Sequence, residues 1–137
     1  MTYILSDVPG RVDSDAVWRF LSTQAYWGRW RTRSDVDRQI ESAWRVVGVY
    51  VEATGEQVGF ARAVSDGVGV AYLADVYIDE GHRGQGLGHR LVATMVDDGP
   101  GADFRWILFT DDAHGVYRDH GFEAPDATAM VRPSRLH

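Results

Sequence analysis

Cysteine is absent from this sequence of 137 residues, which excludes disulfides, thiolate metal sites and any reaction that needs a cysteine nucleophile. Long apolar runs are also absent, and the first ten residues lack the basic and apolar regions of a secretory signal. Basic residues are fewer than acidic ones, 14 against 20, so the net charge of −6 disfavours sequence-independent binding to nucleic acid. We therefore expect a cytoplasmic protein with neither a nucleic-acid nor a membrane partner.

The hydrophobic content is high enough for a folded core. Apolar residues make up 45% of the chain, and five tryptophans are among them, which is typical of a globular protein rather than a disordered one. No internal repeat, low-complexity tract or linker interrupts the sequence. We therefore expect a single domain over residues 1–137.

Alternating and helical periodicities predict a mixture of strands and helices. Strands are expected in "TYILS", in a hairpin of "WRVVGVYVE" and "QVGFARAV", in "VAYLADVYI", in "RWILF" and, at an edge, in "AMVRP". Candidate capping residues precede three helices: Asp13 or Ser14, Ser34 or Asp35, and Asp111 or Asp112. A further helix follows the fourth strand and carries one apolar stripe: Leu87, Leu91, Val92, Met95 and Val96. Strand, helix and the strand "RWILF" together predict a βαβ unit.

A glycine-rich stretch, "HRGQGLGHRL", opens the helix of that unit. At the start of a helix the backbone N–H groups lack intrahelical partners and the dipole is positive. The missing side chains at Gly84, Gly86 and Gly88 would let a bulky anion approach those groups, and Arg83 adds a positive charge at the rim. From these residues alone, a phosphate cradle and an ordinary glycine-rich loop both remain open.

Two well-known phosphate motifs fit this stretch poorly. A Walker A loop ends in Gly-Lys-Ser/Thr, whereas His89 and Arg90 follow Gly88 here. The dinucleotide fingerprint needs a third glycine at the position of His89, and it usually opens its domain, whereas most of this chain precedes the loop.

The segment "DVYIDEGHRGQGLGHRLVATMV" resembles the acetyl-CoA signature of the GNAT superfamily of N-acetyltransferases, Arg/Gln-x-x-Gly-x-Gly/Ala, which Arg83, Gly86 and Gly88 fill. "DAHGVYRDHGF" is similar to the second family signature, a Leu-Tyr-x-x-x-Gly-Phe helix, with Val116 in place of leucine. Shorter stretches such as "YLADVYIDE" resemble a bacterial subgroup whose substrates are mostly unassigned. The resemblance implies an α+β GNAT fold: a mixed central sheet with helices on both faces and a splayed βαβ unit that binds acetyl-CoA.

The resemblance also implies where acetyl-CoA would lie. The backbone of Val76, Tyr77 and Ile78 would pair with the pantetheine arm. The loop would hold the pyrophosphate through Arg83, Gly84, Gln85, Gly86, Leu87 and Gly88. His114 could line the CoA tunnel or relay a proton, or it could lie at the surface or cap a helix. His82 and His89 should shield phosphates or face solvent, and we expect no metal site, because no second ligand stands at a convincing spacing.

The implied reaction is a direct transfer in which a neutral amine attacks the thioester. Tyr117 occupies the family's general-acid position and would protonate the CoA thiolate. The conjugate acid of that thiolate has a pKa of about 8.5 in water. The alternative role of Tyr117 is to pack the last helix on the sheet. A backbone N–H near Val76 would stabilise the oxyanion. Asp75 stands where some family members place a glutamate base, and its alternative role is to order the splay of the strands.

The acceptor should be a primary amine of a small molecule or an exposed amine of a protein. Asp75, Asp111 and Asp112 would lie near the reaction centre and attract a cation before reaction. The aromatic and basic run at residues 26–30 lies where the family builds its acceptor lid, although such aromatics can also just cover the core. A homodimer is compatible with the sequence. The rival function is a catalytically silent acyl-CoA-binding regulatory module, against which the presence of both Tyr117 and Asp75 argues.

Overall fold

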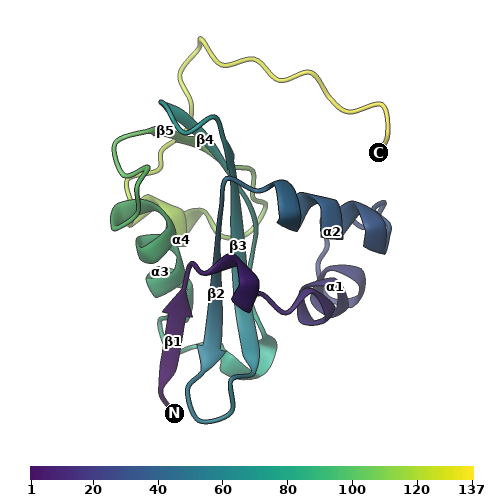
Figure 1. Ribbon diagram of the computed structural model, residues 1–137. Coiled ribbons are helices and arrows are strands. Elements are labelled where there is room, and N and C mark those ends of the chain that lie inside the picture. The colour runs from purple at the N-terminus through teal and green to yellow at the C-terminus, as the bar shows by residue number, and fades with distance from the viewer.

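A mixed five-stranded sheet forms the centre of the computed structural model, which describes residues 1–137 (Figure 1). The strands are β1 Tyr3–Ser6, β2 Arg45–Val51, β3 Gln57–Ser65, β4 Val70–Ile78 and β5 Arg105–Ile107, and they lie in this order across the sheet. The pairs from β1 to β4 are antiparallel, whereas β5 runs parallel to β4. The hairpin and the parallel pair of the predicted βαβ unit are thus confirmed.

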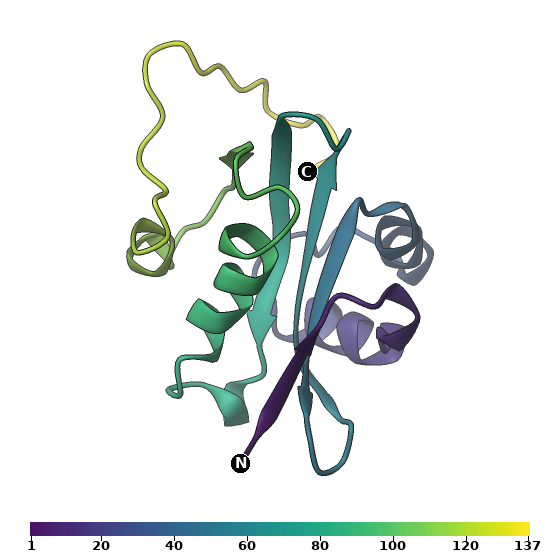
Figure 2. The same cartoon turned by 60° about the vertical axis from the view of Figure 1, so that its left-hand side comes forward.

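Helices cover both faces of the sheet (Figure 1, Figure 2). They are α1 Ser14–Thr23, α2 Arg33–Ser42, α3 Leu87–Val92 and α4 His114–Arg118, and a π-helical turn, Ala93–Asp97, continues α3. On one face α1 and α2 pack on the sheet through Phe20, Val36 and Tyr77. On the other face the apolar stripe of α3 packs with β2 and β4, and all five residues predicted for that stripe are buried. No helix is long and apolar enough to cross a membrane.

The starts of the first two helices follow local capping chemistry. The Asp13 side chain accepts a hydrogen bond from the Ala16 N–H and caps α1, as predicted. The prediction of Ser34 or Asp35 as the cap of α2 is wrong, because Thr32 caps it. The Thr32 hydroxyl accepts from the Asp35 N–H, and the Asp35 carboxylate accepts from the Thr32 N–H, which is a reciprocal capping box.

Strand β4 separates from β5 after a short stretch of pairing. β5 pairs only with Val70, Ala71 and Tyr72, so no strand pairs with the β5-facing edge of β4 over residues 73–78. This is the splayed βαβ unit that the family resemblance implies. The free edge leaves backbone groups that an extended ligand can pair with, as an added strand would.

A bulge interrupts β4 beside that free edge. In the ladder with β3, Phe60 pairs with Tyr77 and Arg62 pairs with Ala74, so Ala61 alone faces two residues of β4, Asp75 and Val76. Asp75 has a φ of 54° and is the only non-glycine residue with a positive φ. Left-handed backbone is costly for a residue with a Cβ, so the contacts of Asp75 must hold it there.

The C-terminal part differs from the prediction in three places. β5 ends at Ile107 rather than at Phe109. Neither Asp111 nor Asp112 caps α4; instead the Thr110 hydroxyl accepts from the N–H of Ala113, the residue that precedes the helix. Residues 129–133 form no edge strand, and residues 123–137 are an exposed extended segment (Figure 1). That segment has too few apolar side chains to bury, and strands need such a face for stability.

Candidate active site

The glycine-rich loop presents its backbone to open space. Gly84 and Gly86 have φ of 81° and 78°, which favours glycine, and Gly86 is the N-terminal cap of α3. A Cβ placed on Gly84, Gly86 or Gly88 would meet no atom within 4 Å. A large group can therefore approach the amides of this loop without displacing any side chain, which fits the pyrophosphate that the resemblance implies.

Side chains of the loop itself hold it against the sheet. The Arg83 Nε donates to the Ile78 carbonyl at 2.9 Å, and the Gln85 amide donates to the Tyr3 hydroxyl at 3.0 Å. His82 is half-buried, and its Nδ1 lies 2.8 Å from the same hydroxyl. Gln85 and His82 therefore anchor the loop to β1, and Arg83 is exposed beyond its Nε contact.

A pocket of about 800 Å³ lies beside the free edge of β4. Its walls are residues 72–76 of β4, residues 108–113 after β5, and residues 26–31 between α1 and α2. Arg62 of β3 and Tyr117 of α4 also line it. The structure thus brings together Asp75, Val76, Tyr117 and the predicted acceptor lid, although they come from three separate parts of the chain.

Tyr117 is buried at the wall of this pocket, with 9% of its surface exposed. Its ring packs edge-on against Phe122. Its hydroxyl forms no hydrogen bond within the chain and is not among the fully buried unpaired atoms, so it reaches the pocket. Burial, reinforced by the negative charge of Asp112, raises the pKa of Tyr117 to about 12. The hydroxyl is therefore protonated at neutral pH and free to donate, so the geometry allows both the packing role and the acid role.

Asp75 is fully engaged with side chains of its own chain. Its Oδ1 accepts from Trp27 Nε1 at 2.8 Å and Arg31 Nη2 at 3.0 Å, and its Oδ2 accepts from Arg31 Nη1 at 2.8 Å and Arg62 Nε at 2.7 Å. Burial by itself would raise the pKa of Asp75, but the hydrogen bonds and charges of Arg31 and Arg62 together hold it below its usual value.

These contacts argue against Asp75 as a proton acceptor. A general base needs a free lone pair within reach of the substrate and a pKa close to the working pH. The carboxylate of Asp75 has four donors on its two oxygens and a lowered pKa. The other role considered from sequence, ordering the strand at the splay, agrees with its position in the β4 bulge.

The loop between α1 and α2 reaches across the pocket to the chain after β5. The Tyr26 hydroxyl donates to Asp112 Oδ1 at 3.3 Å and accepts from the Asp111 N–H at 3.2 Å. Trp30 stacks on His137 near the C-terminus, with ring centroids 4.6 Å apart. The lid is thus tied to the segment that carries the two exposed aspartates.

The remaining histidines lie outside the pocket. His114 is exposed at the first position of α4, makes no side-chain hydrogen bond and does not line the pocket, and its place in the CoA tunnel stays a prediction. His89 Nδ1 lies 3.2 Å from His120 Nε2, and His120 Nδ1 lies 2.7 Å from Asp97. No group of three or more histidine, cysteine, aspartate or glutamate side chains is placed to hold a metal ion.

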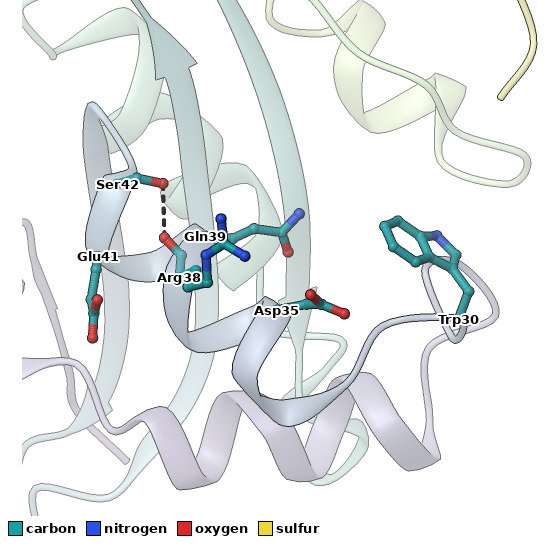
Figure 3. A pocket seen from close by; sticks show the side chains of 6 residues that line it. All are labelled: Trp30, Asp35, Arg38, Gln39, Glu41 and Ser42. Atoms are coloured by element: carbon teal, nitrogen blue, oxygen red, sulfur yellow. Dashed lines mark hydrogen bonds between the residues drawn. The ribbon is translucent and has the colours of Figure 1, made fainter. Parts of the chain in front are cut away.

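A second hollow of about 480 Å³ lies beside α2 (Figure 3). Five of its six lining residues are polar, and within α2 the Ser42 hydroxyl donates to the Arg38 carbonyl at 2.8 Å. Trp30 and Gln39 line both hollows and so divide them. Of the site residues predicted from sequence, only Trp30 of the acceptor lid lines the smaller hollow.

Sequence reasoning missed the two buried arginines, Arg31 and Arg62. One signal was present, because Arg62 interrupts the apolar run "QVGFARAV" of β3 at a position where a buried strand seldom carries a charge. Arg31 lies in an irregular loop, and no local pattern marks it as buried. Only the fold brings both guanidinium groups to Asp75.

One family model and two solved structures match most of the chain. The model of the acetyltransferase (GNAT) family matches residues 15–122. A GNAT-family protein of Xanthomonas campestris pv. campestris is 31% identical and superposes with a TM-score of 0.85, over 98% of this chain and 94% of that one. A candidate acetyltransferase of Deinococcus radiodurans R1 is similar in fold. It is 22% identical and superposes with a TM-score of 0.72, over 98% of this chain and 89% of that one.

Curated relatives match over shorter segments. A candidate acetyltransferase of Gibberella zeae is 37% identical over 86 residues, which is 63% of this chain and 46% of that protein. A histone acetyltransferase of Glycine max is 39% identical over 69 residues, 49% of this chain and 30% of that protein. The match therefore spans less than half the length of either relative.

Proposed function

Because the chain belongs to the GNAT family of acetyltransferases, we propose that it transfers an acetyl group from acetyl-CoA directly to a primary amine. One observation carries the proposal: the free edge of β4 runs from the glycine loop to a pocket that Tyr117 lines. A ligand with a diphosphate at one end, an extended amide arm and a reactive thioester at the other end matches this arrangement.

The chain's own groups suit each part of acetyl-CoA. The amides of residues 83–88 and the exposed Arg83 would hold the pyrophosphate, because the space in front of the glycines is open. The β4 edge at Val76, Tyr77 and Ile78 would pair with the pantetheine amides. Val76 also lines the pocket, so the thioester would lie there, beside the acceptor.

Two groups of the chain would act on the reacting atoms. The Val76 N–H would donate to the oxyanion that develops from the thioester carbonyl. The Tyr117 hydroxyl would give its proton to the departing sulfur, since it is protonated at neutral pH and engaged by no other residue. Asp75 would position these groups by holding the β4 bulge and would take no proton itself.

The pocket mouth suits an acceptor that arrives as a cation. Asp111 and Asp112 are exposed there, and neither forms an ion pair within the chain. Their charges would attract an ammonium group, whose proton would leave to solvent water before attack.

Thiol release from acetyl-CoA with a panel of amines tests the proposal. The panel comprises polyamines, amino acids, aminoglycosides, arylamines and lysine peptides, and calorimetry with acetyl-CoA accompanies it. We expect binding of acetyl-CoA and amine-dependent release of CoA. Binding without release for any amine would instead indicate the catalytically silent acyl-CoA-binding module, and absence of binding would contradict both functions.

A further inference from the structure

The charges at the floor of the pocket do not cancel. The floor consists of Arg31, Arg62 and Asp75, which are all buried and all line the pocket. Two guanidinium groups face one carboxylate, so one positive charge has no counterion among the residues packed there. An unpaired charge away from water is costly, and such groups are normally paired.

Of the two buried arginines, Arg62 is the one whose terminal N–H groups form no hydrogen bond. Arg31 forms a two-pronged pair with Asp75 and also donates to Gly28 and Gln39. Arg62 uses only its Nε, on Asp75. Its two terminal nitrogens form no hydrogen bond within the chain and are not among the fully buried unpaired atoms, so they reach the pocket. Its side chain is only 9% exposed. These terminal N–H groups are thus held in a buried guanidinium that borders the cavity.

We propose that Arg62 binds a carboxylate of the acceptor, so that the substrate is an amino acid in the broad sense, one molecule that carries both an amine and a carboxylate. The planar fork of a guanidinium matches a carboxylate, and one uncompensated positive charge matches a single negative one. This inference rests on the proposed function and names its substrate class.

The position of Arg62 places this contact beside the reaction. Arg62 pairs with Ala74, the residue before the β4 bulge, and the proposed oxyanion donor Val76 is the second residue of that bulge. Neighbouring strands are about 4.8 Å apart. A small amino acid can therefore reach Arg62 with its carboxylate while its amine lies at the thioester, and the aspartates at the mouth face the ammonium as it arrives.

Matched substrate pairs test the inference. Amino acids of increasing amine-to-carboxylate separation, each beside its own carboxamide, are compared by kcat/KM in the thiol-release assay, with phosphoethanolamine as a phosphate-bearing amine. We expect the wild-type protein to prefer the free acid over the amide by roughly 10- to 100-fold, mainly through KM, as for a charged hydrogen bond. Equal use of acid and amide, or a preference for the phosphate, would overturn the carboxylate assignment.

Two variants locate the preference at Arg62. Arg62→Lys keeps the charge beside Asp75 but removes the fork, and Arg62→Gln removes the charge, so the acid preference should shrink in the first and vanish in the second. Arg38→Gln is the matched control, because it removes the same charge from the smaller hollow beside α2 (Figure 3), and it should keep the wild-type preference. If the Arg62 variants retain the full preference, Arg62 serves only as a counterion of Asp75.

A binding measurement separates this inference from the proposed function. Calorimetry compares N-acetyl amino acids with their carboxamides, in the presence of CoA, and it needs no turnover. Tighter binding of the acids, reduced in Arg62→Lys and lost in Arg62→Gln, supports the carboxylate site even if no amine is acetylated. Equal binding contradicts the carboxylate site even if other amines are good substrates.

Discussion

Tyr117 and Asp75 are both buried in the pocket wall, yet their surroundings shift their ionisation in opposite directions. Burial raises the pKa of Tyr117 to about 12, so the phenol keeps its proton. For Asp75 the effect of burial is outweighed by Arg31 and Arg62, which hold its pKa below the usual value, so the carboxylate keeps its charge. Tyr117 is therefore protonated and Asp75 is charged at neutral pH, which are the states that the proposed acid and positioning roles require.

Replacement of Tyr117 by Phe tests the first role. The ring and its packing on Phe122 remain, so the affinity for acetyl-CoA should be unchanged, while kcat should fall by roughly 10²- to 10⁴-fold. Tyr50→Phe is the control, since its hydroxyl is buried without a partner and lies outside the pocket. Unchanged turnover in Tyr117→Phe with a good acceptor would leave Tyr117 as a packing residue only.

Replacement of Asp75 by Asn tests the second role. Two buried guanidinium groups would lose their counterion, so we expect a loss of about 3–5 kcal/mol in the free energy of unfolding at pH 7. A depressed folded pKa means that the stability from Asp75 is present above its unfolded value of 3.8 and is lost as pH falls through the lower folded value. The stability difference between variant and wild type should therefore shrink below pH 3.8.

The pH dependence of turnover in Asp75→Asn separates positioning from base catalysis. For a positioning residue, kcat should be lowered at every pH, and the profile should run parallel to that of the wild type. Recovery of turnover at high pH, where the amine is already neutral, would restore Asp75 as the general base.

At the scale of elements, the site depends on two stretches of exposed backbone, one at the edge of β4 and one in the loop before α3. β4 keeps its pairing with β3 but loses β5 after Tyr72, and the loop before α3 has no side chains over its glycines. One edge of unpaired backbone therefore continues into the start of a helix. A ligand that is extended at one end and anionic at the other is the partner that such an edge suits.

Gly86→Asp tests the loop. The carboxylate would lie against the proposed pyrophosphate, so binding of acetyl-CoA should be abolished while the fold is largely kept. Gly55→Asp is a close control, because Gly55 has a similar φ of 76° and equally open surroundings, but it lies in the β2–β3 hairpin. Both variants should lose a similar amount of stability, and only Gly86→Asp should lose binding in calorimetry. Wild-type affinity in Gly86→Asp would refute the phosphate interpretation of the loop.

At the scale of the whole molecule, two apolar cores hold the sheet between its helices, and the C-terminal segment adds little to either. Residues 123–137 are exposed, and the GNAT family match ends at residue 122. Their contact with the site is the stack of His137 on Trp30 at the pocket. The cytoplasmic location and the homodimer stay predictions.

Deletion of residues 123–137 should therefore separate stability from acceptor binding. We expect a melting temperature close to that of the full chain, because almost no buried surface is removed, and an unchanged affinity for acetyl-CoA. KM for the acceptor should change, since the lid loses the stack on Trp30. A large drop in melting temperature would show that this segment packs on the domain in solution.

Short sequence patterns were sufficient to predict much of the fold, the glycine-rich loop and the position of Tyr117. The cap at Asp13, the hairpin at residues 53–56 and the apolar stripe of α3 depend on neighbours within a few residues, so their patterns identified them. The glycine loop and Tyr117 were found in the same way, because their motifs are contiguous. Thr32 was missed as the cap of α2, since several polar residues stand near the start of that helix, and the start of α4 at Ala113 has no side-chain cap at all.

Only the tertiary structure determined the ionisation of Asp75 and the side chains that contact it. From sequence, a carboxylate on a strand near the reaction centre could be a base or a structural group with equal reason. Its ionisation depends on Arg31 and Arg62, which lie 44 and 13 positions away along the chain and meet it only when the loop before α2 packs on β3 and β4. Because electrostatic energies depend on distance and burial in space, no local pattern could have revealed that this aspartate is ion-paired with two arginines or that Arg62 keeps free donors beside it.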